Sequence, residues 1–76
     1  MSITGKWYLE QKMFTEAIPL YQQAEEIAEQ NRFLAEKLDI FTDLCTCYKE
    51  IGDETRYIQY TEKVYQTNKE INFERR

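Results

Sequence analysis

The stretch that decides the fold is residues 34–53, LAEKLDIFTDLCTCYKEIGD. Its apolar residues recur every three or four positions, which is the spacing of one face of an α-helix about five turns long. This face consists of Leu34, Leu38, Phe41, Leu44, Cys45, Tyr48 and Ile51. Gly52 then stands where a glycine in the left-handed conformation ends many helices. The stretch is therefore predicted to form a long amphipathic helix with a defined end.

The order of residue types in this stretch resembles the first helix of a tetratricopeptide (TPR) repeat. That helix carries an aromatic residue, a Leu with a small neighbour, a Tyr and then a turn. The matching residues here are Phe41, Leu44, Cys45, Tyr48 and Gly52. Phe41 stands where the family usually has Trp, and Cys45 where it usually has Gly. The resemblance implies an all-α fold of antiparallel helix-turn-helix pairs, with four helices in about two repeats.

A helix is also predicted over residues 13–31, which carry an apolar stripe with acids and amides on the other side. The stripe consists of Ala17, Leu20, Tyr21, Ala24, Ile27 and Ala28. Pro19 is tolerated only near a helix N-terminus, so this helix is expected to begin close to Phe14 or Thr15. Thr15 is the expected N-cap residue, and residues 31–32 are the expected turn. The second half of the TPR pattern is matched by Phe14, Ala17, Tyr21 and Ala24.

The last helix is predicted over residues 54–71, with Asp53 as its N-cap. Its apolar and aromatic face consists of Tyr57, Ile58, Tyr60, Thr61, Val64, Tyr65 and Ile71. Tyr57 stands where the first repeat has Ala17. A bulky side chain at this crossing predicts a splayed helix pair or a different packing partner.

Residues 1–12 are predicted to be the tail end of a first helix, because their pattern matches the deciding stretch at a distance of 40 residues. The matching pairs are Gly5 and Cys45, Tyr8 and Tyr48, and Lys12 and Gly52. We expect one TPR-like domain over residues 1–76, with a first repeat at 1–31 and a second at 33–71. We also expect it to be a fragment of a longer array.

A spacing of 40 residues is longer than the usual 34 of a TPR repeat. Long, degenerate repeats of this kind resemble those of the peptide-pheromone-responsive regulators of Gram-positive bacteria, the Rap, NprR and PlcR type. HEAT-like arrays also have helix pairs of this length, but they lack the Ala-x-x-x-Tyr and Leu-small-x-x-Tyr patterns. The resemblance implies a right-handed superhelix whose concave groove, lined by the first helix of each pair, holds a peptide.

Carried onto this chain, the resemblance implies a set of polar groove-facing positions for a peptide or protein partner. These positions are Lys6, Asp39, Thr42, Thr46 and Lys49, with Ser2 and Leu9 on the first helix and Glu10, Asp43 and Glu50 as flanking residues. An ordinary solvated helix face explains the same pattern, so both interpretations stay open. The acids disfavour one mode of the family, in which Lys, Asn and Arg clamp the carboxylate end of a chaperone peptide.

The composition limits the classes of partner that are expected. Ten basic residues are scattered among fourteen acids, for a net charge of −4, whereas a duplex-binding surface needs clustered Lys and Arg. Direct nucleic-acid binding by this segment is therefore not expected. No run of 18 apolar residues and no signal peptide is present, so no membrane span is expected and the cytoplasm is the default compartment.

No catalytic, metal or cofactor site is expected. The chain has no His and no glycine-rich phosphate loop, and its carboxylates are spread along solvated faces. Cys45 and Cys47 are the only cysteines, and on a helix they point about 200° apart, so they neither bridge one another nor share a metal comfortably. One buried small residue and one half-buried thiol explain the pair.

The favoured function is a non-catalytic peptide- or protein-binding module of a regulatory protein in transcription or signalling. The alternative is self-association. Repeat arrays usually need three or more units to bury a continuous core, and eleven aromatic residues exceed what so small a core easily buries. In this alternative Tyr57, Tyr60 and Tyr65 pair with a second copy, in a homodimer or a higher assembly.

Overall fold

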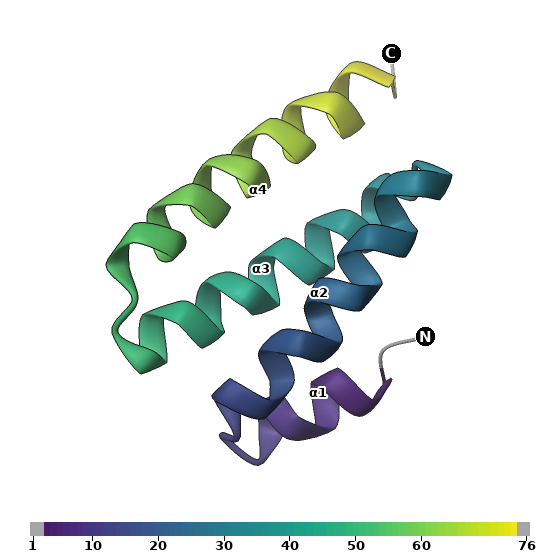
Figure 1. Cartoon of the computed structure of the whole chain (residues 1–76). Coiled ribbons are helices and arrows are strands. Elements are labelled where there is room, and N and C mark those ends of the chain that lie inside the picture. Colours follow the sequence, from purple (N-terminus) through teal and green to yellow (C-terminus); the bar gives the residue numbers. More distant parts are fainter. Residues whose placement is uncertain (1–2, 75–76) are drawn as a thin grey trace.

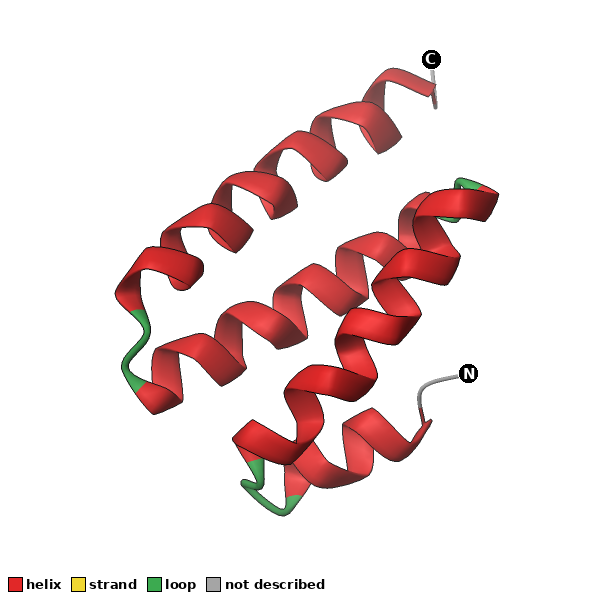
Figure 2. Cartoon of the chain, viewed as in Figure 1, coloured by secondary structure: helices red, strands yellow, loops and turns green. Residues whose placement is uncertain are grey.

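The structure, a computed structural model, describes residues 3–74 as four helices. They are α1 (Ile3–Glu10), α2 (Phe14–Asn31), α3 (Leu34–Ile51) and α4 (Glu54–Glu74). Residues 3–74 contain helices and short turns and no strand (Figure 2). The predicted all-α fold with four helices is confirmed. In this part of the chain no helix has the length and apolarity needed to cross a bilayer.

Each helix packs against the next one along the chain: α1 on α2, α2 on α3, and α3 on α4. Successive helices run in opposite directions, so the chain forms consecutive helical hairpins (Figure 1). α1 has 8 residues and α2 has 18, and α1 lies along the first half of α2. The second half of α2 therefore extends past the N-terminal end of α1.

The turn between α3 and α4 follows from local chemistry. Gly52 has φ +83°, which glycine adopts without steric cost, and its N–H donates to the Lys49 carbonyl at 3.2 Å. The Asp53 N–H donates to the Tyr48 carbonyl at 2.9 Å, which completes the end of α3. The Asp53 carboxylate then accepts the Arg56 N–H at 3.2 Å and caps α4. Both the glycine end and the Asp53 cap are confirmed.

The same turn occurs between α1 and α2, at equivalent positions 40 residues earlier. Lys12 has φ +62° and its N–H donates to the Leu9 carbonyl at 3.0 Å. The Met13 N–H donates to the Tyr8 carbonyl at 2.8 Å. Each of these bonds matches one in the α3–α4 turn, so the two hairpins are joined by turns of one kind.

The predicted Thr15 cap is wrong. α2 begins at Phe14, with Met13 in the N-cap position. The Thr15 hydroxyl donates instead to the Glu16 carboxylate at 2.9 Å. The cause is the Met13 N–H bond to α1, which closes the turn and starts the helix before Thr15. The turn expected at residues 31–32 is confirmed, with Arg32 in the left-handed conformation at φ +56°.

The core lies along α3, which has α2 on one side and α4 on the other. Its buried apolar residues are Ala17, Tyr21 and Ala28 of α2 and Ile40, Phe41, Leu44, Cys47 and Tyr48 of α3. From α4, Tyr60 and Val64 pack against this core while half-buried. The Tyr60 hydroxyl and the Lys63 ammonium both donate to the Glu25 carboxylate of α2, at 2.9 and 3.2 Å.

The predicted apolar face of α3 is wrong in three places. Cys47 is buried, whereas Cys45 is half-buried against Thr61 of α4, with 3.8 Å between sulfur and hydroxyl oxygen. Ile51 is exposed, and Ile40, which the spacing left out, is buried. A helix between two neighbours buries two stripes, one towards each neighbour, whereas the prediction from spacing allowed for a single buried stripe.

Candidate functional site

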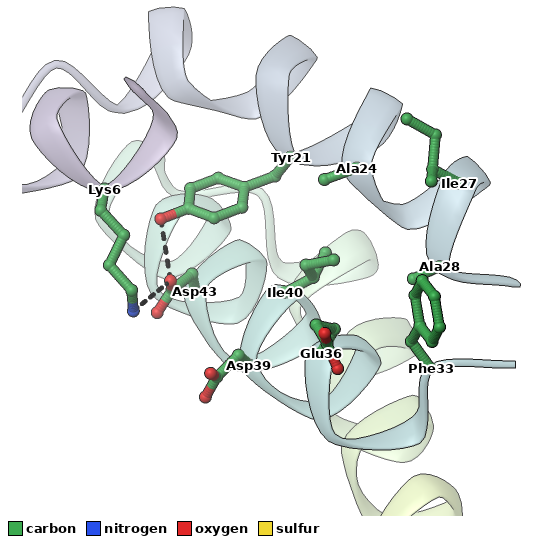
Figure 3. Close-up of a pocket in the computed structure, with 10 residues that line it drawn as sticks. All are labelled: Lys6, Tyr21, Ala24, Ile27, Ala28, Phe33, Glu36, Asp39, Ile40 and Asp43. Atoms are coloured by element: carbon green, nitrogen blue, oxygen red, sulfur yellow. Dashed lines mark hydrogen bonds and ion pairs between the residues drawn. The ribbon is translucent and has the colours of Figure 1, made fainter. Parts of the chain in front are cut away.

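A cleft of about 490 Å³ lies between α2 and α3, beyond the N-terminal end of α1 (Figure 3). We call it the α2–α3 cleft. Its lining residues are Lys6, Tyr21, Ala24, Ile27, Ala28, Phe33, Glu36, Asp39, Ile40 and Asp43. Most of the surface inside it is apolar.

The two walls of the cleft differ in chemistry. The α2 wall carries Ala24 with Ile27 and Ala28, which follow it by three and four residues and so lie on the same face. Phe33, in the turn between the helices, closes one end. Figure 3 shows the second wall, where the carboxylates of α3 follow one another along the helix with Ile40 between them. An apolar wall therefore faces an acidic one.

The acidic residues of α3 are Glu36, Asp39 and Asp43, which form the acidic edge of the cleft. Successive members lie three and four residues apart, so all three lie on one face of the helix. Asp43 forms an ion pair with Lys6. Among the described side chains of residues 5–73, neither Glu36 nor Asp39 takes part in an ion pair. The acidic edge thus holds one neutralised carboxylate and two exposed ones.

Asp43 joins three helices at the end of the cleft nearest α1. Its carboxylate accepts the Tyr21 hydroxyl of α2 at 2.8 Å and the Lys6 ammonium of α1 at 3.0 Å. The Asp43 side chain is 13% exposed and that of Lys6 54%, so the lysine reaches over the carboxylate from the solvent side. This arrangement fixes the position of Asp43 and leaves the rest of the acidic edge open.

The electrostatics of this network favour the protonated form of both donors. Burial and the hydrogen bond to Asp43 raise the pKa of the Tyr21 hydroxyl well above its usual value. The hydrogen bond to Asp43 raises the pKa of Lys6, and the charge of Asp39 adds to the effect. Lys6 therefore shows that the acidic edge attracts a cation.

The structure brings together two of the five predicted binding residues. Lys6 and Asp39 both line the α2–α3 cleft. Thr42, Thr46 and Lys49 are exposed on α3 but do not line it. The hydroxyls of Thr42 and Thr46 donate to backbone carbonyls one turn earlier, at 2.7 and 3.3 Å.

The residues predicted to extend and flank this set are also divided. Asp43 lies in the cleft, whereas Glu10 and Glu50 are exposed outside it. Leu9 packs against the core. Ser2 lies outside the described residues.

Sequence reasoning missed the apolar wall and Tyr21 as parts of the site. The spacing on residues 13–31 assigned Tyr21, Ala24 and Ile27 to the buried stripe of a helix pair. In the structure Ile27 is exposed. The sequence did offer one signal of this site. Phe33 is an apolar residue in the segment where the apolar spacing of one helix gives way to that of the next.

The three tyrosines predicted for self-association do not share a face. Tyr60 is half-buried, with its ring stacked on Tyr48 at 5.5 Å between centroids and its hydroxyl bonded to Glu25. Tyr57 and Tyr65 are 36% and 62% exposed on the outside of α4. Ile58 is exposed beside them. The outer face of α4 is therefore formed by Tyr57, Ile58 and Tyr65.

A second hollow, of about 420 Å³, lies where α2, α3 and α4 meet. It is wide and mixed in charge, and its lining residues are Glu29, Lys37, Phe41, Gln59, Glu62, Lys63, Gln66, Thr67 and Glu70. The Lys63 ammonium lies over the Tyr60 ring, 4.7 Å from its centroid. Because its walls carry both acidic and basic side chains, this hollow presents no single sign of charge to a ligand.

The thiols are not activated as nucleophiles. Burial, together with the charge of Asp43, raises the pKa of Cys47 to about 11. Burial also raises the pKa of Cys45. Within the described part of the chain, no group of three His, Cys, Asp or Glu side chains is placed to hold a metal ion.

Comparison of the chain with models of protein families, with curated proteins and with solved structures gives no match.

Proposed function

We propose that this chain is a non-catalytic, TPR-like binding module that holds a peptide or protein segment in the α2–α3 cleft. The observation that carries the proposal is the exposure of large apolar side chains on this cleft. Ile27 is 58% exposed and Phe33 is 47% exposed, beside a hollow of about 490 Å³. Covering apolar surface is favourable by about 25 cal/mol per Å², so a ligand that fills the cleft gains free energy there.

The size of the hollow supports the proposal. Ligand sites in proteins usually have volumes of about 300–1,000 Å³, apolar walls and a few polar groups that orient the ligand. The α2–α3 cleft combines an apolar wall with the acidic edge, whose position Tyr21 and Lys6 fix through Asp43.

Two pairs of contacts support the TPR-like interpretation. Gly5 is buried against the Tyr21 ring, where an added Cβ would lie 3.3 Å from Tyr21 Cζ. Forty residues later, Cys45 contacts Thr61. A smaller residue thus meets a larger one in the first hairpin, and two residues of intermediate size meet at the same place in the second. The matching hydrogen bonds of the α1–α2 and α3–α4 turns also support a repeat of 40 residues.

The regulatory part of the proposal rests on the resemblance to the peptide-pheromone-responsive regulators. In this view the module belongs to a cytoplasmic protein of transcription or signalling and supplies peptide recognition. The two free thiols are compatible with a reducing compartment.

The test is a selection of peptides from a random displayed library, followed by affinity measurements on two matched variants. Ile27→Gln removes an apolar side chain from the cleft. Ile58→Gln removes the same side chain from the outer face of α4, where it is 57% exposed. We expect Ile27→Gln to weaken a selected peptide about tenfold, which corresponds to one buried aliphatic side chain, and Ile58→Gln to leave the affinity unchanged.

Circular dichroism of both variants checks that the helices are intact. Equal affinities for wild type and Ile27→Gln, or equal losses in both variants, would contradict a binding site in the cleft.

The outer face of α4 favours self-association as a second candidate function. Tyr57, Ile58 and Tyr65 are exposed there, in a helix whose other side packs on α3. Light scattering of the chain at tens of micromolar tests this candidate, with Tyr65→Glu as the disrupting variant. A dimer that Tyr65→Glu dissociates would support self-association, and a monomer at these concentrations excludes it.

A further inference from the structure

The charges of the α2–α3 cleft indicate what kind of segment it accepts. Glu36 and Asp39 are exposed at its acidic edge, one turn of α3 apart, while the opposite wall is apolar. A ligand that fills the cleft therefore places apolar groups against Ile27 and Phe33 and polar groups beside two carboxylates. Negative groups of the ligand beside these two carboxylates would be repelled, and cations there would be attracted.

α1 shows how a helix fits this position. It lies on α2 with Gly5 packed against the Tyr21 ring, and it extends Lys6 to Asp43 of the acidic edge. The α2–α3 cleft continues from the N-terminal end of α1 along the same two helices (Figure 3). A basic helix in the cleft would place its own cations beside Asp39 and Glu36, one and two turns of α3 before Asp43. Its cations, one turn apart, would match the spacing of Asp39 and Glu36.

A second copy of this chain is a poor occupant for this edge, because each copy carries a net charge of −4. An acidic or neutral segment gains nothing from the two exposed carboxylates. The combination of an apolar wall and an acidic edge selects a segment with the opposite arrangement, apolar on one side and basic on the other.

We infer that the α2–α3 cleft binds a basic amphipathic helix, whose apolar side chains cover Ile27 and Phe33 and whose Lys or Arg side chains pair with Asp39 and Glu36. This inference rests on the proposed function, since it names the class of segment that the same cleft binds. Each new ion pair would resemble the one between Lys6 and Asp43, in which a lysine from a neighbouring helix pairs with a carboxylate of the acidic edge.

The test uses three synthetic, fluorescently labelled peptides of about four helical turns. All three share one stripe of Leu, and the positions flanking the stripe are Lys, Gln or Glu. Fluorescence anisotropy measures their affinities at low ionic strength and at about 0.15 M salt. We expect the Lys peptide to bind roughly fivefold tighter than the Gln peptide, which is the effect of two exposed ion pairs, and the Glu peptide to bind more weakly than both. The differences should shrink at the higher salt concentration.

Two double variants separate local charge from net charge. Glu36→Gln with Asp39→Asn removes the two exposed carboxylates of the cleft while keeping the shapes of the side chains. Glu50→Gln with Glu62→Gln removes the same charge from exposed positions outside the cleft. The preference for Lys should disappear in the first variant and persist in the second.

The outcomes distinguish this inference from the proposed function. If the three peptides bind equally and Ile27→Gln weakens all of them, the cleft binds segments without regard to charge, and the inference is overturned while the proposed function stands. Library peptides that bind through Ile27 without Lys or Arg overturn it as well. A dimer of the chain that dissociates on Ile27→Gln overturns it in favour of a second copy. If neither the designed nor the library peptides bind through Ile27, the proposed function itself fails.

Discussion

At the scale of single residues, Tyr21 is the link between the core and the α2–α3 cleft. Its ring is buried against Gly5, and its hydroxyl donates to the largely buried Asp43 carboxylate at 2.8 Å. Tyr21→Phe should lower the free energy of unfolding by about 1–2 kcal/mol, because a hydrogen bond to a charged acceptor is lost and Asp43 keeps only Lys6. Urea unfolding followed by circular dichroism measures this change.

Tyr48→Phe is the matched control for this prediction. The Tyr48 hydroxyl accepts a bond from Gln22 at 3.3 Å, which is longer and involves two neutral groups. Its loss should cost about 0.5 kcal/mol, at the low end for a single hydrogen bond. A cost for Tyr48→Phe as large as that for Tyr21→Phe would show that the Asp43 contact has no special strength.

At the scale of elements, the two hairpin turns are alike in hydrogen bonding but differ in the residue with positive φ. Gly52 holds this position between α3 and α4, and Lys12 holds it between α1 and α2. An added Cβ at Gly52 would meet nothing within 4 Å, so the cost of Gly52→Ala is purely that of the backbone, about 1 kcal/mol. Lys12→Gly should have the opposite sign and raise the stability by a few tenths to about 1 kcal/mol.

Thermal unfolding of the two variants measures both changes. Glu50→Ala, an exposed substitution in α3 two residues before Gly52, is the control and should shift the stability by less than about 0.5 kcal/mol. Equal stability of wild type and Gly52→Ala would contradict a strained backbone at this turn.

At the scale of the whole molecule, the buried Tyr21 and the half-buried Tyr60 predict a loss of stability at alkaline pH. Burial and hydrogen bonds to Asp43 and Glu25 raise the pKa values of Tyr21 and Tyr60 in the folded chain. The unfolded chain therefore releases these protons first, at about pH 10, so the free energy of unfolding falls as the pH rises further. The slope should approach about 1.4 kcal/mol per pH unit for each tyrosine.

Cys47 adds to this loss in a lower window, because burial raises its pKa to about 11 from a usual value near 9. Urea unfolding at a series of pH values from 8 to above 10 measures the profile. Tyr60→Phe should make the fall above pH 10 shallower, since one of the two tyrosines no longer titrates. A profile that is flat up to pH 11 would contradict the burial of these groups.

The parts of the fold that depend on neighbours in the sequence were predictable. The end of α3 and the start of α4 follow from the local chemistry of Gly52 and Asp53, and the helices follow from apolar spacing, although α4 continues to Glu74 rather than ending at residue 71. The α2–α3 cleft was not predictable, because the apolar spacing of residues 13–31 does not distinguish the exposed Ile27 from the buried Ala28 beside it. The interchange of Cys45 and Cys47 in the core has a similar cause, since the period of a helix does not tell how many neighbours it has.

The two thiols of α3 lie close together in the sequence but report on different interfaces. Cys45 lies at the seam with α4, against Thr61, while Cys47 is buried on the same side of α3 as Asp43, which bonds to α2. A small alkylating reagent reaches the half-buried Cys45 in the intact fold, but it reaches the buried Cys47 only after α2 separates from α3. The modification rate of Cys47 relative to that of Cys45 therefore measures how often α2 separates from α3, with an internal reference in the same unaltered chain.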